Sequence, residues 1–133
     1  MSGLADMRAA LETAISAMSP ALDTAWENVA FAPSPGVAYQ RVEFMFARPA
    51  NDEVSANYRQ DGICQVTLCY PTNAGAAAIV ARAELLKATF ARGQSFSANA
   101  TVTKVSDTPE AMAAYVDGDR FCVPVRIRVF AQL

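Results

Sequence analysis

Apolar residues near the start of the chain recur at intervals of three and four, the spacing of one face of an amphipathic helix. This stripe consists of Leu4, Met7, Leu11, Ala14, Ile15 and Met18. The helix is expected to end at Ser19, because the residue before a proline avoids the helical region. From Pro20 to Gly36 the chain is too rich in proline for a central strand and too apolar for a free linker. We therefore expect this tract to pack over one edge of the core.

Two segments that follow have the pattern of β-strands. From Val37 to Phe46 polar and apolar residues alternate, with Gln40, Val42, Phe44 and Phe46 on one face and Tyr39, Arg41, Glu43 and Met45 on the other. The run from Ile63 to Tyr70 is rich in β-branched and aromatic residues. The two strands are expected to form an antiparallel hairpin. The polar segment from Asn51 to Gln60 is expected to be a loop, and the most mobile internal part of the free protein.

A second helix is predicted over about Ala74 to Ala91. Its apolar positions are Ala76, Ile79, Val80, Ala83, Leu86 and Phe90. Thr72 and Asn73 are suitable N-cap residues, and Gly93 suits the helix end.

Two further strands are predicted, from Ser95 to Val105 and from Phe121 to Ala131, with a turn at Asp117-Gly118-Asp119 before the second. In the last strand Arg126 and Arg128 share one face with Pro124, opposite an apolar face. The predicted fold class is α+β, a single domain over residues 1–133 with the order α-β-β-α-β-β. Its sheet is expected to be largely antiparallel, with the helices packed on one face.

Composition narrows the classes of function. The chain has 133 residues, 53% of them hydrophobic and 18% charged, and a net charge of -2. These values are typical of a globular domain and give no general attraction to nucleic acid or to an anionic membrane. No apolar run is long enough for a membrane span or a signal peptide, so we expect a protein of the cytosol.

The sequence also lacks the usual elements of catalysis. It contains no histidine, which removes the commonest general base and the commonest nitrogen ligand for metals. It has no glycine-rich phosphate-binding motif. Two acidic pairs, Asp52 with Glu53 and Asp117 with Asp119, are interpreted as solvated turn residues. No catalytic, cofactor-binding or metal-binding residue is predicted, and no cofactor.

The cysteines and the single tryptophan are interpreted as packing residues. Cys64 and Cys69 are five residues apart in a predicted strand, so they point to opposite faces and cannot share a metal or a disulfide. We interpret both of them, and Cys122, as small apolar fillers. Trp26 is interpreted as a core residue in preference to a ligand-stacking one.

Several short segments, in their order and spacing, resemble the phage tail terminator-like family, minor tail proteins that cap the tail tube of long-tailed phages. They include the initial helix and the alanine-rich helix that ends with Leu86 to Phe90. The others are Ala25-Trp26-Glu27-Asn28 followed by Phe31 and Pro33, Tyr39-Gln40-Arg41-Val42, Arg59-Gln60-Asp61-Gly62-Ile63-Cys64-Gln65-Val66, Tyr70-Pro71, and Asp117-Gly118-Asp119-Arg120-Phe121-Cys122-Val123-Pro124-Val125.

The resemblance implies a structural virion protein that forms a homohexameric ring, stops tail tube polymerisation and joins the tail to the head connector. The implied partners are other copies of the chain, the tail tube protein and the head-tail connector protein. The implied location is the host cytoplasm during assembly and then the virion tail. The family has no catalytic residues to transfer. As candidate contacts in the ring or with the tube we select exposed charged positions and one tyrosine: Asp52, Glu53, Tyr58, Arg59, Asp117, Asp119, Arg126 and Arg128.

Two other functions are compatible with the sequence. One is a neck or head-completion protein of the same virion, which would also be small and ring-forming. The other is a small ligand-binding enzyme or regulatory module with a pocket between sheet and helices. For Arg126 and Arg128, a merely solvated outer strand face competes with a specific contact.

We expect the purified protein to show no hydrolase, transferase or redox turnover, because histidine and a phosphate-binding loop are both missing. Standard activity screens test this. A robust activity that is lost on changing one acidic residue would contradict it.

Overall fold

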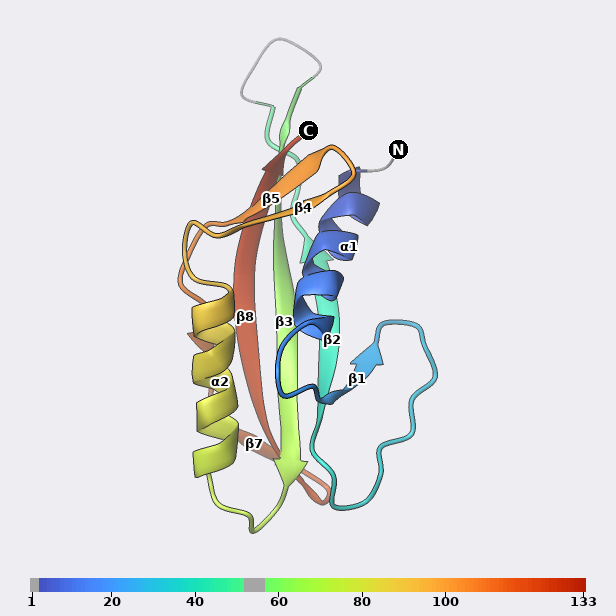
Figure 1. The fold of residues 1–133 in the computed structure, drawn as a ribbon, viewed down its shortest axis with the longest axis vertical. Helices are drawn as coiled ribbons and strands as arrows, with labels where there is room; N and C mark the ends of the chain where they lie inside the picture. The colour runs from blue at the N-terminus through green and yellow to red at the C-terminus, as the bar shows by residue number, and fades with distance from the viewer. Residues whose placement is uncertain (1–2, 52–56) are drawn as a thin grey trace.

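The computed structural model describes residues 3–51 and 57–133, and within them the chain forms two helices and eight strands (Figure 1). In chain order these are α1 (Gly3–Ser16), β1 (Asp23–Trp26), β2 (Tyr39–Phe46), β3 (Arg59–Pro71), α2 (Ala77–Thr89), β4 (Ser95–Ala98), β5 (Thr101–Val105), β6 (Glu110–Ala111), β7 (Tyr115–Asp117) and β8 (Arg120–Gln132).

The two longest strands, β3 and β8, form the centre of the sheet. They pair antiparallel over their whole length, from Arg59 opposite Gln132 to Pro71 opposite Arg120. The strand order is β1-β2-β3-β8-β5-β4, and the short strands β6 and β7 also pair with β8. Of these pairings only β1 with β2 is parallel.

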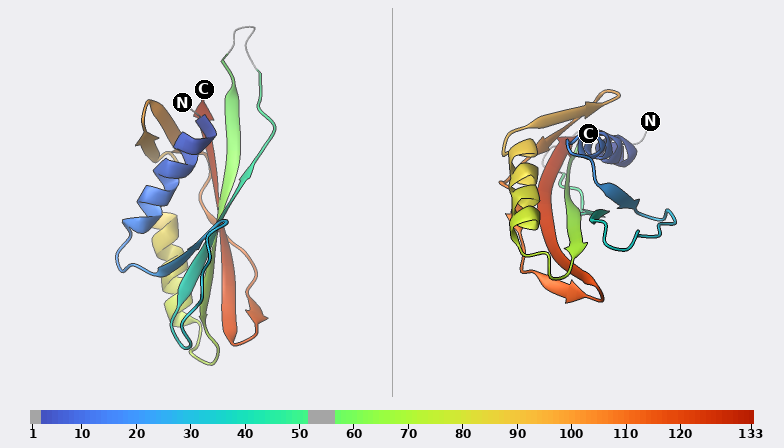
Figure 2. Two further views of the ribbon diagram at one scale, coloured as in Figure 1. Left: turned by 90° about the vertical axis from the view of Figure 1, so that its right-hand side faces the viewer. Right: turned by 60° about the horizontal axis from the view of Figure 1, so that its bottom comes forward.

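The hydrophobic core lies between the sheet and the two helices, which stand on the same side of the sheet in Figure 2. Both helices and the strands β2, β3, β5 and β8 contribute to it. Its largest fully buried apolar side chains are Phe90, Met7, Leu11, Ile15, Leu68, Ile79, Leu86 and Ile127. We call this side of the sheet the inner face and the opposite side the outer face.

The α+β class and the mostly antiparallel sheet are confirmed, but the predicted element order is wrong. The hairpin of β2 and β3 is present, with Tyr39 opposite Cys69 and Phe46 opposite Gly62. The tract after Pro20 contains an unpredicted edge strand, β1. The predicted strand from Ser95 to Val105 is a hairpin, because Asn99 adopts a φ of 53° and turns the chain between β4 and β5. Strands β6 and β7 were also not predicted.

Other boundaries differ as well. Helix α2 begins at Ala77, and its N-cap is Ala76 with no side-chain hydrogen bond, not Thr72 or Asn73. The backbone of Thr72 instead donates to the carbonyl of Asp119 and continues the pairing of β3 with β8. Val80, predicted on the buried stripe, is exposed.

The polar segment before β3 is also shorter than predicted. Arg59 and Gln60 belong to β3, and the Gln60 side chain is buried and donates to the carbonyl of Ala47. Residues 52–56 of the predicted mobile loop lie outside the described residues.

A buried carboxylate connects α1 to the β4–β5 hairpin. Asp6, 4% exposed, accepts hydrogen bonds from Asn99 Nδ2 at 2.7 Å and from Thr101 Oγ1 at 2.9 Å. Asp6 also lies in the first turn of α1, where the helix dipole favours a negative charge. The contact therefore fixes the hairpin over the helix.

The change Asp6→Ala is expected to lower the free energy of unfolding by about 1–3 kcal/mol, because it leaves the donors of Asn99 and Thr101 without their acceptor. Urea denaturation of the variant beside Asp107→Ala, a change at an exposed loop aspartate, measures the difference. Equal stability of the two variants would contradict the structural role of Asp6.

Candidate assembly surface

The middle of the outer face carries a mixed row of charged and apolar side chains. The register of the three central strands places Met45 beside Ile63 and Ile63 beside Arg128. In the next row Gln65 lies beside Arg126. We call Met45, Ile63, Arg126 and Arg128 together the basic face. Neither helix covers this side of the sheet (Figure 2).

Both arginines of the basic face have partners within the chain, and that of Arg128 is an exposed ion pair. Arg126 Nε donates to Gln65 Oε1 at 3.0 Å. Arg128 Nη1 lies 3.4 Å from Glu110 Oε1, in a pair whose side chains are 38% and 55% exposed. An ion pair this exposed contributes only about 0–1 kcal/mol. Arg128 can therefore exchange its partner for another carboxylate at little energetic cost.

A hollow lies directly beside the basic face. It measures about 330 Å³ and is formed mainly by the ends of β2 and β3 and by β8. Met45, Ile63 and Arg128 are among its lining residues, and Met45 is 44% exposed. The hollow therefore combines apolar walls with a guanidinium.

The turn from β7 to β8 carries the opposite charge. Asp117 and Asp119 flank Gly118, whose φ of 60° makes the turn, and both carboxylates are exposed. Val116 and Tyr115 precede them and are 66% and 42% exposed. We call Tyr115, Val116, Asp117 and Asp119 the acidic end. It lies at the end of the sheet opposite the C-terminus (Figure 1).

The structure separates the predicted contact residues into groups. Asp117 and Asp119 precede β8, whereas Arg59 pairs with Gln132 at the other end of this strand. A strand of this length spans about 40 Å, so the two groups cannot form one patch within a subunit. Arg126 and Arg128 lie between them, and the prediction that both share the outer face is confirmed.

Arg59, the first residue of β3, already has contacts within the chain. It contacts Asp61 at 2.9 Å and its guanidinium lies over the Phe130 ring. The backbone of Tyr58 exchanges two hydrogen bonds with Leu133. The remaining candidates, Asp52 and Glu53, lie outside the described residues.

Arg120 does not extend the basic face, although it is the first residue of β8. It is 5% exposed and donates to the carbonyl oxygens of Ser34 and Val37, and its guanidinium lies over the Tyr39 ring. We call these contacts the Arg120 clasp. They hold the long β1–β2 connection, residues 27–38, against the sheet.

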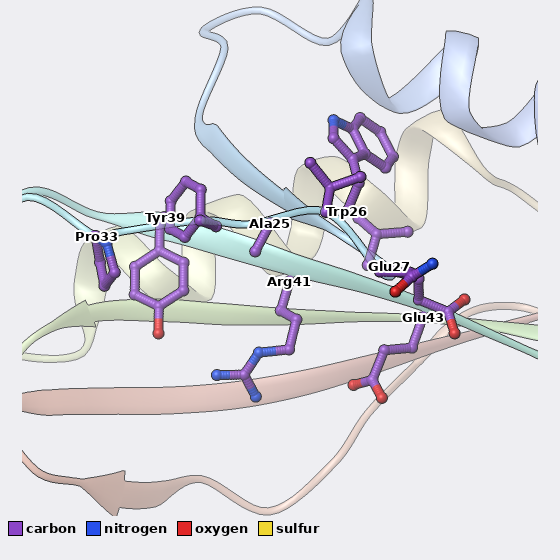
Figure 3. A pocket seen from close by; sticks show the side chains of 11 residues that line it. Ala25, Trp26, Glu27, Pro33, Tyr39, Arg41 and Glu43 are labelled. Carbon is purple, nitrogen blue, oxygen red and sulfur yellow. The ribbon is translucent and has the colours of Figure 1, made fainter.

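A second hollow, of about 490 Å³, lies beside this connection (Figure 3). Trp26, Tyr39, Arg41 and Glu43 line it. Trp26 also packs against the core, as predicted. Although burial alone would lower the pKa of Arg41, the neighbouring Tyr39 and Cys69 raise it above its usual value, so the guanidinium remains charged.

Glu27 also lines this hollow, and its carboxylate already contacts two groups of the chain. Its Oε1 accepts the backbone N–H of Phe44 at 2.7 Å and lies 3.2 Å from Arg8 Nη1. It thus takes the place of a strand partner for β2 beyond the end of β1. This role was not predicted, since it depends on the parallel pairing of β1 with β2.

The described part of the chain contains no cluster of three or more cysteine or acidic side chains that could hold a metal ion. None of its helices is long and apolar enough to cross a membrane. The basic face and the acidic end, which carry opposite charges beside exposed apolar side chains, suit contacts with other proteins.

Comparison with known proteins gives a consistent picture. One solved structure, of a protein that carries no functional name, is similar over 95% of this chain and 93% of its own, with a TM-score of 0.75 and 24% sequence identity. That likeness shows the fold alone. No curated protein matches the sequence. The family model described as phage tail terminator protein matches residues 6–129. The chain therefore belongs to the phage tail terminator family, whose members are structural proteins of the virion tail.

Proposed function

We propose that this protein forms a closed ring that ends tail tube polymerisation and joins the tail to the head connector. Ring formation is supported chiefly by one observation: a single subunit presents two different patches of opposite charge, the basic face and the acidic end, far apart on the same sheet. Two different patches make a head-to-tail contact, and such contacts produce a ring when the rotation between subunits closes. Six subunits is the number that the family resemblance implies.

In the proposed contact the acidic end of one protomer docks on the basic face of the next. Val116, 66% exposed, enters the hollow beside Met45, and Asp117 approaches Arg128. The apolar insertion supplies most of the affinity, since burying a valine side chain is worth about 1.5–3 kcal/mol. The charges mainly fix the register and exclude other partners. A dilute subunit can therefore remain monomeric and assemble at high concentration or on the tube end.

Reversing the charge of the basic face with Arg126→Glu and Arg128→Glu is expected to weaken assembly and leave the fold intact. Both side chains lie on the outer face, away from the core. Mass measurement in solution across a concentration series should show the monomer persisting to higher concentration than in the parent protein. Arg92→Glu, at an exposed arginine outside both patches, is the control.

A compensating variant makes this test specific. Adding Asp117→Lys and Asp119→Lys to the two arginine changes exchanges the sign of both patches, so that neighbouring protomers again carry opposite charges. Assembly should recover. If the fourfold variant assembles no better than the double variant, or if the double variant assembles normally, the proposed contact is wrong.

Tails made without the protein separate the proposed function from that of a neck protein. Loss of a terminator should give tubes of excessive and variable length, because nothing stops polymerisation. Electron microscopy of tails from phage that lack the gene measures this length. Tails of normal length that fail to join heads would contradict the terminator function and support a neck or head-completion protein.

A further inference from the structure

Two of the three cysteines lie side by side on the outer face of the sheet. Cys69 of β3 is directly opposite Cys122 of β8, and their sulfur atoms are 3.2 Å apart. Both are free thiols, 0% and 2% exposed. The pairing was not predicted, because the sequence does not show which strands become neighbours.

The backbone at this position suits a bond between the two strands. At one end of the β3–β8 ladder Tyr58 and Leu133 exchange both backbone hydrogen bonds, and at the other Thr72 donates to Asp119. Hydrogen-bonded and non-hydrogen-bonded pairs alternate along an antiparallel ladder. Cys69 is an odd number of residues from both Tyr58 and Thr72, so it forms a non-hydrogen-bonded pair with Cys122.

Non-hydrogen-bonded pairs bring opposite Cα atoms to about 4.5 Å, within the range of about 4.4–6.8 Å seen across disulfides. We propose that Cys69 and Cys122 are a thiol oxidation site, at which a small-molecule disulfide converts the two thiols into a bond between β3 and β8. The sulfur atoms must approach from 3.2 Å to about 2.05 Å. Small side-chain rotations provide this movement.

The reaction proceeds by two exchanges, here written for oxidised glutathione. One cysteine thiolate attacks the glutathione disulfide, which forms a mixed disulfide and releases one glutathione thiolate. The second cysteine thiolate then attacks the protein sulfur of the mixed disulfide and releases the other glutathione thiolate. The two protons from the cysteines pass to the two released thiolates. The chain loses two electrons and two protons, and oxidised glutathione becomes two molecules of reduced glutathione.

The same surroundings make the site slow to react. Burial, and then the neighbouring Cys69, raise the pKa of the Cys122 thiol to about 12, so little thiolate is present near neutral pH. Phe31 and Tyr39 pack against the two cysteines. The Arg120 clasp holds the connection that carries Phe31. Oxidation therefore requires residues 27–38 to move away from the sheet.

Cys64 provides an internal control. It is fully buried in the core on the inner face, separate from the cluster that contains Cys69 and Cys122. Burial also raises the pKa of the Cys64 thiol. It is also a buried thiol, but Phe44 and Ile127 lie opposite it in the neighbouring strands instead of a cysteine, so it should stay reduced.

The test is incubation of the whole protein with oxidised glutathione, followed by denaturation, thiol counting and peptide mapping. The three thiols should fall to one, with Cys69 joined to Cys122 within one chain, and a reductant should restore all three. The Cys64→Ala variant, which has two thiols when reduced, should retain none after oxidation. A midpoint temperature about 5 °C or more above that of the reduced protein is also expected, because the bond closes a long loop.

Two variants test the pairing of the cysteines and the protection that Phe31 gives them. Cys122→Ala should form no bond within the chain and show no rise in midpoint temperature, and Cys69→Ala serves equally if the first variant does not fold. Phe31→Ala should be oxidised several times faster than the parent chain.

The proposal is overturned if the parent chain keeps three thiols, retains glutathione, or links only between chains. An unchanged rate in Phe31→Ala would overturn the role of the connection. None of these measurements depends on ring assembly.

Discussion

The pairing of β3 with β8 is the constraint on which the other features depend. It runs without interruption from Arg59 opposite Gln132 to Pro71 opposite Arg120. Successive side chains of a strand point to opposite faces, so a shift of one residue would expose the core and bury the charged row. The buried Val66, Leu68 and Ile127 on one face therefore fix the positions of Arg126 and Arg128 on the other. The same register places Cys69 opposite Cys122.

Local patterns in the sequence predicted those parts of the fold that depend on neighbouring residues. The alternation in the last strand correctly separated its apolar face from Arg126 and Arg128, and the alternation from Val37 identified β2. The turn at Gly118 was predicted from its flanking aspartates. The missed strands β1, β6 and β7 depend on their pairing partners, whereas the missed turn between β4 and β5 is a local feature. β1 is a strand because it lies parallel to β2, and β6 and β7 exist because they pair with β8.

In the candidate assembly surface, too, the features that depend on neighbouring residues were predicted and those that depend on strand pairing were not. The sequence showed that Arg126 and Arg128 share a face and that Asp117 and Asp119 occupy a turn, since both are local properties. It did not show that these two groups lie apart on one sheet, that Arg120 is buried beneath residues 27–38, or that Cys69 meets Cys122. Asn99 was a readable turn signal within an apparently continuous strand, because asparagine tolerates positive φ.

In the proposed ring, neighbouring protomers meet through different patches, with Val116 of one against Met45 of the next. The most direct measurement mixes two single variants, Val116→Cys and Met45→Cys, under assembly conditions and then adds a short thiol cross-linker. The account predicts a cross-linked dimer that joins position 116 of one chain to position 45 of another, and little product from either variant alone. Cross-links only between two copies of Val116→Cys, or none in assembled rings, would contradict it.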